Sequence, residues 1–269
     1  GNVPLAVHDG TSGDIDGDGD IDIVVFPTGS CTETPYEKLP TKLINDGNGN
    51  FTEYNLFEDE NIILEEGIET WITTSHHLFD INGDGNLDVI GGHYQGKIDS
   101  RFKDLEWNSH HKDLTMTGIF IAYGSSDGKY YYDNIDYVDD NVLGSEITQI
   151  LYGFAFTDYD SDGDFDIILS NYIIDPSITI NLDSNIYVLE LLENDNGTFK
   201  NVTEERIEGY VDYSETVFSN FYRPIIQDID DDGDYDIVAT AYNYHQQLDY
   251  LSLLYWEKEG SNYIRREIK

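Results

Sequence analysis

Four short acidic stretches, spaced almost evenly along the chain, constrain the fold more than any other feature. They read GDIDGDGDIDIVV (13–25), FDINGDGNLDVI (79–90), TDYDSDGDFDIIL (157–169) and QDIDDDGDYDIVA (227–239). Their first aspartates are Asp14, Asp80, Asp158 and Asp228, which lie 66, 78 and 70 residues apart. A nearly constant period of this length indicates that one structural unit is repeated four times.

Each repeat predicts four β-strands. An apolar or aromatic run leads into the acidic stretch, and a short β-branched run leaves it at 21–26, 87–90, 165–169 and 235–239. These exit runs are apolar on both faces, as expected of strands buried between packed sheets. A third run ends in a glycine turn before an aromatic residue, as in NDGNGNF (45–51) and NDNGTF (194–199), which is typical of a hairpin. A fourth strand closes the repeat.

We therefore predict an all-β protein, a β-propeller built of four-stranded antiparallel blades. A single domain over residues 1–269 is expected, with approximate blades at 1–70, 71–140, 141–215 and 216–269. The first blade begins at its inner strand (5–8) and the last ends with its outer strand (263–268), so neither end supplies a strand to the other. The four blades form either a complete small ring or part of a larger propeller.

The charge balance excludes several partner classes. The formal net charge is −40, from 54 Asp and Glu against 14 Lys and Arg. Nucleic acid needs a basic footprint, and anionic membrane surfaces also attract basic segments, so we expect neither partner. No apolar run reaches the length of about 18 residues that predicts a membrane span. A chain with 39% hydrophobic and 13% aromatic residues is nevertheless expected to fold rather than stay disordered.

The acidic stretches have the pattern of a calcium loop. Numbered from the first aspartate, position 6 is always glycine, and positions 1, 3, 5 and 9 carry side-chain oxygens. Hard oxygen ligands at alternating positions around a glycine turn are typical of Ca²⁺ sites, whereas Mg²⁺ prefers stricter octahedra. An EF-hand is excluded because its position 12 needs Glu and here holds Val25, Gly91, Leu169 or Ala239. The candidate ligands are Asp14, Asp16, Asp18, Asp22, Asp80, Asn82, Asp84, Asp88, Asp158, Asp160, Asp162, Asp166, Asp228, Asp230, Asp232 and Asp236.

The pattern D-x-D-x-D-G-x-x-D, followed by an apolar strand and N-D-G-x-G-x-F, resembles the FG-GAP/VCBS repeat family. Repeats of that family form the calcium-bearing blades of integrin-α-type propellers and of many secreted microbial proteins and lectins. The resemblance implies four Ca²⁺ sites, bound by the side chains of positions 1, 3, 5 and 9 and by the carbonyl of position 7. Position 7 is Asp20, Asn86, Asp164 and Asp234. The second site, with Asn82 in place of an acid, is expected to bind more weakly.

Other ligands are expected on the face opposite the calcium loops, where the remaining connections of the blades gather. The longest connection, 95–117, holds four of the fourteen basic residues together with a tryptophan, and could bind an acidic glycan or a neighbouring acidic surface. Aromatic side chains with polar groups suit sugar rings. The candidates are His93, Tyr94, Arg101, Trp107, Tyr222, Arg223, Tyr242 and His245.

These features predict an extracellular calcium-binding propeller that acts as a rigid recognition, adhesion or assembly module. Its partner would be a protein, a glycan, further copies of the chain or further blades of a larger protein. Two alternatives remain open: a carbohydrate-binding lectin, and a polysaccharide lyase that uses tyrosine and histidine for proton transfer on acidic glycans. We assign no catalytic residue, because Cys31 has no recognisable partner and the sequence has no phosphate-binding glycine loop.

Overall fold

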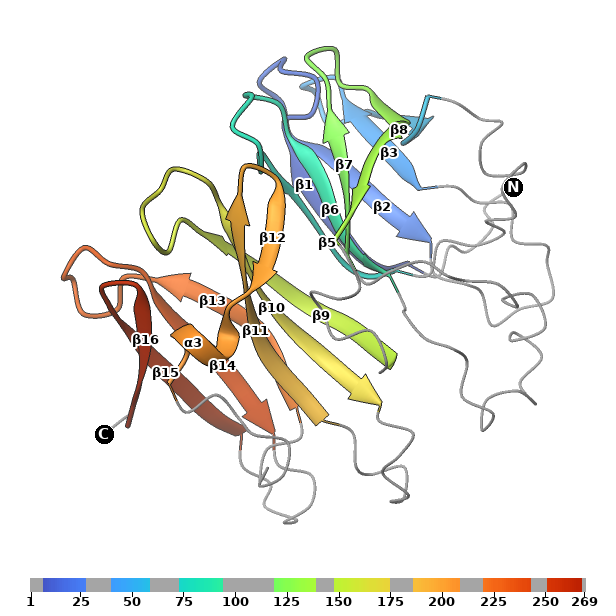
Figure 1. The fold of residues 1–269 in the computed structure, drawn as a ribbon. Coiled ribbons are helices and arrows are strands. Elements are labelled where there is room, and N and C mark those ends of the chain that lie inside the picture. The colour runs from blue at the N-terminus through green and yellow to red at the C-terminus, as the bar shows by residue number, and fades with distance from the viewer. Residues whose placement is uncertain are drawn as a thin grey trace, which may run out of the picture. The chain divides into compact units, whose positions relative to one another are not determined.

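The computed structural model describes residues 7–27, 40–58, 73–93, 119–138, 148–174, 186–208, 220–242 and 251–267 (Figure 1). The chain divides into two compact units, residues 1–138 and 139–269. The described residues form sixteen strands and one short helix. Within these residues, no helix is long and apolar enough to cross a membrane.

The first unit contains two four-stranded sheets. One sheet consists of β1 (Val7–Gly13), β2 (Asp22–Pro27), β3 (Thr41–Asn45) and β4 (Phe51–Asn55). The other consists of β5 (Thr73–Phe79), β6 (Asp88–His93), β7 (Ile119–Gly124) and β8 (Tyr130–Tyr137). In each sheet the strands follow their order in the chain, and each strand pairs antiparallel with the next.

The second unit repeats this arrangement. Its first sheet consists of β9 (Thr148–Thr157), β10 (Asp166–Ile174), β11 (Ile186–Asp195) and β12 (Thr198–Asn201). Its second sheet consists of β13 (Asn220–Gln227), β14 (Asp236–Tyr242), β15 (Leu251–Glu259) and β16 (Asn262–Arg266). A single helical turn, α3 (Thr203–Arg206), follows β12. The four sheets are the four-stranded antiparallel blades that the sequence predicts, so the fold class is confirmed; we number them blades 1 to 4.

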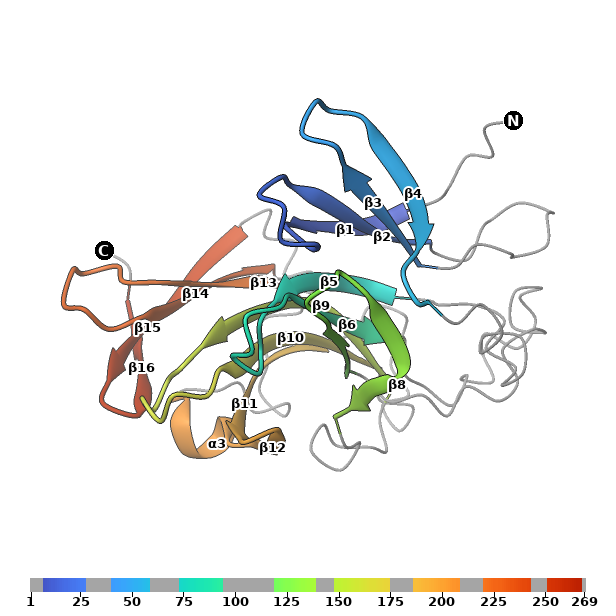
Figure 2. The ribbon, with the colours of Figure 1, turned by 90° about the horizontal axis from the view of Figure 1, so that it is seen from above.

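Each acidic stretch is the hairpin connection between the first two strands of its blade. The residue before the first aspartate pairs with the aspartate of position 9 in all four blades: Gly13 with Asp22, Phe79 with Asp88, Thr157 with Asp166 and Gln227 with Asp236. Within each unit, the acidic loops extend from the same end of the two sheets (Figures 1 and 2). The register therefore presents the loops of a blade pair side by side.

The apolar exit strands form the cores of the two units. In the first unit, Val24 and Phe26 of blade 1 belong to one buried cluster with Val89 and Phe120 of blade 2. In the second unit, the cluster includes Ile168 of blade 3 and residues of blade 4, among them Ile237, Ala239, Leu254 and Trp256. Side chains alternate along a strand, so position 11 of one blade (Val24, Ile168) packs toward position 10 of the next (Val89, Ile237) in both units.

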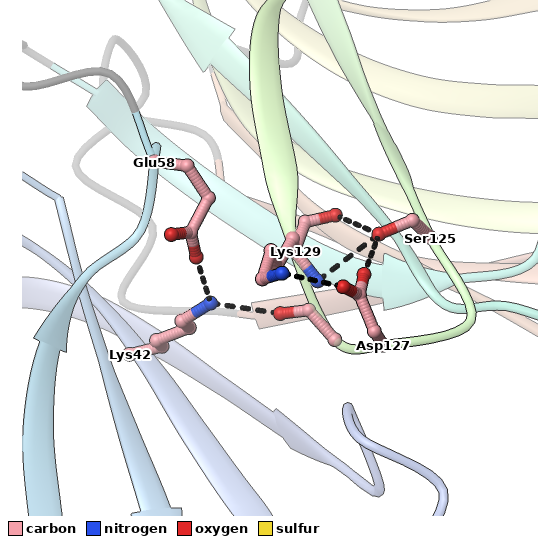
Figure 3. A network of polar contacts seen from close by, with 6 residues as sticks. Lys42, Glu58, Ser125, Asp127 and Lys129 are labelled. Carbon is pink, nitrogen blue, oxygen red and sulfur yellow. Dashed lines mark hydrogen bonds and ion pairs between the residues drawn. The ribbon is translucent and has the colours of Figure 1, made fainter.

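The two blades of the first unit are also joined by a main-chain and side-chain connection near the turn between β7 and β8 (Figure 3). Phe57 forms a parallel bridge with Tyr130, and the Glu58 N–H donates to the Tyr130 carbonyl at 3.1 Å. The buried ammonium of Lys42 donates to the Gly128 carbonyl at 2.8 Å and pairs with Glu58 at 3.1 Å. Blade 1 thus contacts the turn of blade 2 through the almost fully buried ammonium group of Lys42.

Candidate metal centres

The four acidic loops close on one hydrogen-bond pattern. The position 1 carboxylate accepts from the N–H of the position 6 glycine, at 3.0, 2.8, 3.2 and 3.0 Å in blades 1 to 4. The position 3 side-chain oxygen accepts from the position 5 N–H at 3.0–3.3 Å. The position 5 carboxylate accepts from the position 7 N–H at 2.8–2.9 Å. The side chains predicted to bind metal are therefore also those that hold the loop in its turn.

The turn requires left-handed backbone at two positions. The position 6 glycines have φ between 90° and 101°, which only glycine adopts readily. A Cβ at any of these four glycines would meet nothing within 4 Å, so conformation rather than space explains the glycine. Position 4 is also left-handed: it is glycine in blades 1 and 2, but Ser161 (φ 63°) and Asp231 (φ 62°) in blades 3 and 4. The last two residues carry backbone strain.

Carboxylate oxygens converge in three of the loops. One oxygen from each member of the groups Asp14–Asp16–Asp18, Asp158–Asp160–Asp166 and Asp228–Asp230–Asp232 lies within 4.8 Å of the others. In blade 2, Asn82 stands at position 3 and its amide nitrogen donates to Asp84 at 3.2 Å. The second loop therefore offers an amide oxygen in place of a carboxylate, as its sequence indicates.

The electrostatics of these loops favour a bound cation. Burial, followed by the neighbouring position 5 carboxylate, raises the pKa of Asp16, Asp160 and Asp230, the position 3 acids. In blade 1, Oδ1 of Asp14 is buried without a hydrogen-bond partner among the described residues. Grouped carboxylates with raised pKa values and an orphaned oxygen are the donor set that a hard divalent cation would satisfy.

The position 9 aspartates have a second role that the sequence analysis did not assign. Asp22, Asp88, Asp166 and Asp236 are at most 1% exposed. In each, Oδ2 accepts from the N–H of position 2 at 2.9–3.1 Å. Oδ1 accepts from an N–H on the third strand or at its end (Asn45, Gly124, Asn194, Lys258) at 2.8–2.9 Å. We call this arrangement the aspartate clamp, because it ties the loop to a strand beyond its own hairpin.

Burial changes the protonation equilibrium of two clamp aspartates, Asp88 and Asp166. Burial raises the pKa of Asp88 to about 6 and that of Asp166 to about 7, although two backbone N–H groups oppose the shift in each. A signal for this role was present in the sequence: one acid recurs inside an otherwise apolar exit run. Its hydrogen-bond partner on the third strand follows only from the folded structure.

In blades 3 and 4, the side chain of position 7 contacts groups other than the carboxylates of positions 1, 3 and 5. Asp164 accepts from the Asn196 N–H at 2.7 Å, and Asp234 accepts from the Lys258 ammonium at 3.3 Å. In blade 2, the Asn86 amide donates to Asp84 at 2.9 Å. These contacts are compatible with the predicted use of the position 7 carbonyl, which stays a prediction.

The ligand residues predicted on the opposite face cannot be placed. Tyr94, Arg101, Trp107 and His245 lie outside the described residues. For His93, Tyr222, Arg223 and Tyr242 only the strand positions are described, not the side chains. These assignments stay predictions.

Comparison with solved structures yields distant likenesses. The chain is similar to a rhamnogalacturonan lyase of Bacillus licheniformis (12% identity, 96% of this chain and 50% of that one, TM-score 0.48). It is also similar to a β-fructofuranosidase of Bombyx mori (12%, 100% and 52%, TM-score 0.47) and to an exotype rhamnogalacturonan lyase (14%, 88% and 39%, TM-score 0.44). The chain thus spans about half the length of the first two. No curated protein sequence matches it.

A family comparison is more specific. Residues 14–91 match the family model of the FG-GAP-like repeat. This segment begins at the first aspartate of blade 1 and includes the whole acidic loop of blade 2. The FG-GAP-like resemblance is therefore confirmed over residues 14–91, which include the acidic loops of blades 1 and 2.

Proposed function

We propose that this chain is a calcium-stabilised β-propeller module that acts outside the cell as a rigid recognition, adhesion or assembly unit. One observation carries the proposal: the same oxygen-lined loop, with the same internal hydrogen bonds, is built four times at the same end of a blade. A solvated acidic turn would have no reason to repeat this arrangement in every blade.

The donor set fits calcium. Side chains of positions 1, 3 and 5 would hold the ion, with the position 7 carbonyl and the position 9 carboxylate as further ligands. Ca²⁺ takes six to eight oxygens in flexible geometry, and the loops of blades 1, 3 and 4 each bring three carboxylate oxygens within 4.8 Å of one another. Four ions would reduce the net charge from −40 to −32, relieving repulsion inside the loops while leaving a strongly acidic, soluble surface.

The same features support an extracellular role. Calcium-dependent folding requires a medium in which calcium is plentiful, and the FG-GAP-like repeat is the class of sequence found in such proteins. A propeller whose loops are held by metal offers a rigid frame for a protein or glycan partner. The lyase hypothesis receives no support from the described side chains and stays a prediction.

The test is a calcium titration combined with thermal unfolding. Isothermal titration of the metal-free protein should show about four Ca²⁺ per chain, and Asn82→Asp should tighten the weakest site because it supplies the missing carboxylate. Each site loaded at 100 times its Kd should add about 2.7 kcal/mol to the free energy of unfolding. Mg²⁺ is the control and should give a smaller increase. An equal Tm in calcium and in chelator, with no heat of binding, would refute the proposal.

A further inference from the structure

A cleft lies between blades 3 and 4, at the end of the sheets that carries their acidic loops. Its volume is about 530 Å³, within the range of small-ligand pockets. Three aromatic side chains line it: Phe156, Phe165 and Tyr235. Thr157, Asp234 and Lys258 supply polar groups. All of these residues belong to the second unit.

In the first unit, a side chain fills the corresponding space. By repeat position, Gly13 corresponds to Thr157 and Leu87 to Tyr235. A Cβ on Gly13 would lie only 2.6 Å from Cδ1 of Leu87, so that leucine fills the space beside blade 1. The cleft therefore lies where the second unit differs from the first, with Thr157 in place of Gly13 and Tyr235 in place of Leu87.

A third difference between the units lies at the third-strand residue whose N–H donates to the clamp aspartate. Gly124 and Lys258 correspond, since each donates its N–H to the clamp aspartate of its blade. A Cβ on Gly124 would lie 2.3 Å from the Leu87 carbonyl oxygen, so the blade 2 loop rests directly on that glycine. There the Tyr130 hydroxyl donates to the same carbonyl at 2.6 Å. Blade 4 has Lys258 at this position, and Lys258 lines the cleft.

Lys258 is a buried cation that has more hydrogen-bond donors than described acceptors. Its side chain is only 8% exposed, and its ammonium has three N–H donors. Among the described residues it donates to Asp234 alone, at 3.3 Å. Buried donors are costly when left without acceptors, so the remaining N–H groups are suited to oxygen atoms of a ligand in the cleft.

The aromatic residues supply the complementary apolar surface. Phe165 and Tyr235 occupy position 8 of the two neighbouring loops and are 37% and 58% exposed. Rings that remain this exposed beside a cleft suit ligands with one apolar face and several hydroxyl edges. A pyranose ring has this shape, with axial C–H groups on its face and oxygens around its rim.

We propose that the cleft between blades 3 and 4 binds one pyranose residue of a glycan. The sugar packs a C–H face on Phe165 or Tyr235, and one of its oxygens, hydroxyl or carboxylate, accepts from Lys258. This site would give the proposed recognition function a ligand. It rests on the proposed function in one respect: bound calcium would order the acidic loops that form the walls of the cleft. It is separate from the candidate residues on the opposite face.

The test measures glycan binding by the calcium-loaded protein. An array of neutral and uronic acid oligosaccharides identifies a binder, and titration calorimetry with that oligosaccharide gives its Kd. Tyr235→Leu introduces the blade 2 residue at an exposed position and should weaken binding at least tenfold without loss of Tm. Lys258→Met, which keeps the length of the side chain, should weaken binding by a similar factor. The matched control Tyr54→Leu alters an exposed tyrosine of blade 1 and should leave the Kd unchanged.

The outcomes separate the two proposals. A larger loss for uronic acids than for neutral sugars in Lys258→Met assigns the contact to a carboxylate, and an equal loss assigns it to a hydroxyl. The cleft proposal is overturned if no oligosaccharide binds the calcium-loaded wild type, or if both cleft variants bind like the wild type. Sugar binding by a protein that takes up no calcium would instead overturn the calcium proposal and leave the cleft standing.

Discussion

The two blade pairs share a main-chain joint and differ in the side chains that close it. In both, a residue that follows the fourth strand forms a bridge with a buried tyrosine of the next blade: Phe57 with Tyr130, and Ile207 with Tyr263. In the first pair a buried Lys42 reaches the Gly128 carbonyl, whereas in the second the Trp256 indole donates to the Glu208 carbonyl at 3.0 Å. The repeats thus keep backbone contacts and vary the packing around them.

The largest expected effect comes from the tryptophan of the second pair. Trp256→Ala should lower the free energy of unfolding by about 3–5 kcal/mol, because it empties a fully packed position and removes the hydrogen bond to Glu208. The register aligns Trp256 with Ala122 of the first pair, where Phe26 and Phe120 fill the core instead. Urea unfolding followed by circular dichroism measures the loss. A loss below 1 kcal/mol would mean that the second joint does not depend on this side chain.

Two clamp aspartates, Asp88 and Asp166, should make the stability of the metal-free protein fall with rising pH, whereas salt-bridged acidic side chains make stability rise. The pKa values of Asp88 and Asp166 are raised in the folded state to about 6 and about 7, so the folded protein binds more protons than the unfolded chain between about pH 4 and these values. Stability in chelator should therefore fall as the pH rises through this window, on the order of 1 kcal/mol per pH unit and group.

The two pairs are distinguishable in this experiment. The first pair loses its contribution by about pH 6, and the second continues to about pH 7. Saturating calcium should abolish the slope, since the metal takes the place of the proton. If the stability of the metal-free protein in chelator rises steadily from pH 4 to pH 7, the raised pKa values of Asp88 and Asp166 are contradicted.

The buried lysine of the first pair should contribute less than the tryptophan of the second. Lys42→Met should cost about 1–3 kcal/mol, because it leaves the buried Gly128 carbonyl and Glu58 without their donor. The control is Lys200→Met, which breaks an ion pair with both partners 62% exposed and should change stability by less than about 1 kcal/mol. Equal effects of the two substitutions would show that the lysine contact adds nothing to the joint.

The smallest effect concerns position 4 of the loops, which is glycine in the first pair and Ser161 or Asp231 in the second. Ser161→Gly and Asp231→Gly should each raise the free energy of unfolding by up to about 1 kcal/mol, because they relieve left-handed strain. The converse change, Gly17→Ser, should lower it by a similar amount. Thermal unfolding in saturating calcium measures all three. Destabilisation by both glycine substitutions would mean that the native side chains make compensating contacts.

The strands and loops could be predicted from the sequence because their determinants are local. Alternating aspartates, the glycine of position 6 and the apolar exit run place each hairpin without knowledge of the rest of the chain. The aspartate clamp, the Lys42 contact and the cleft at Lys258 could not be predicted. Each depends on a contact between residues that are far apart in the sequence, on a third strand or in a neighbouring blade. Local sequence patterns do not indicate such contacts. Whether four blades complete a ring stays a prediction.

The aspartate clamp has a consequence for how such a chain can arise. Its donors and acceptor all come from one blade, so the loop is supported without help from any neighbour. A gene segment encoding one repeat would therefore carry its own loop support when duplicated. A new copy would then have to adapt only its contact with the neighbouring blade. This contact is where the two pairs differ: the first has the buried Lys42, and the second has Trp256 and the open cleft.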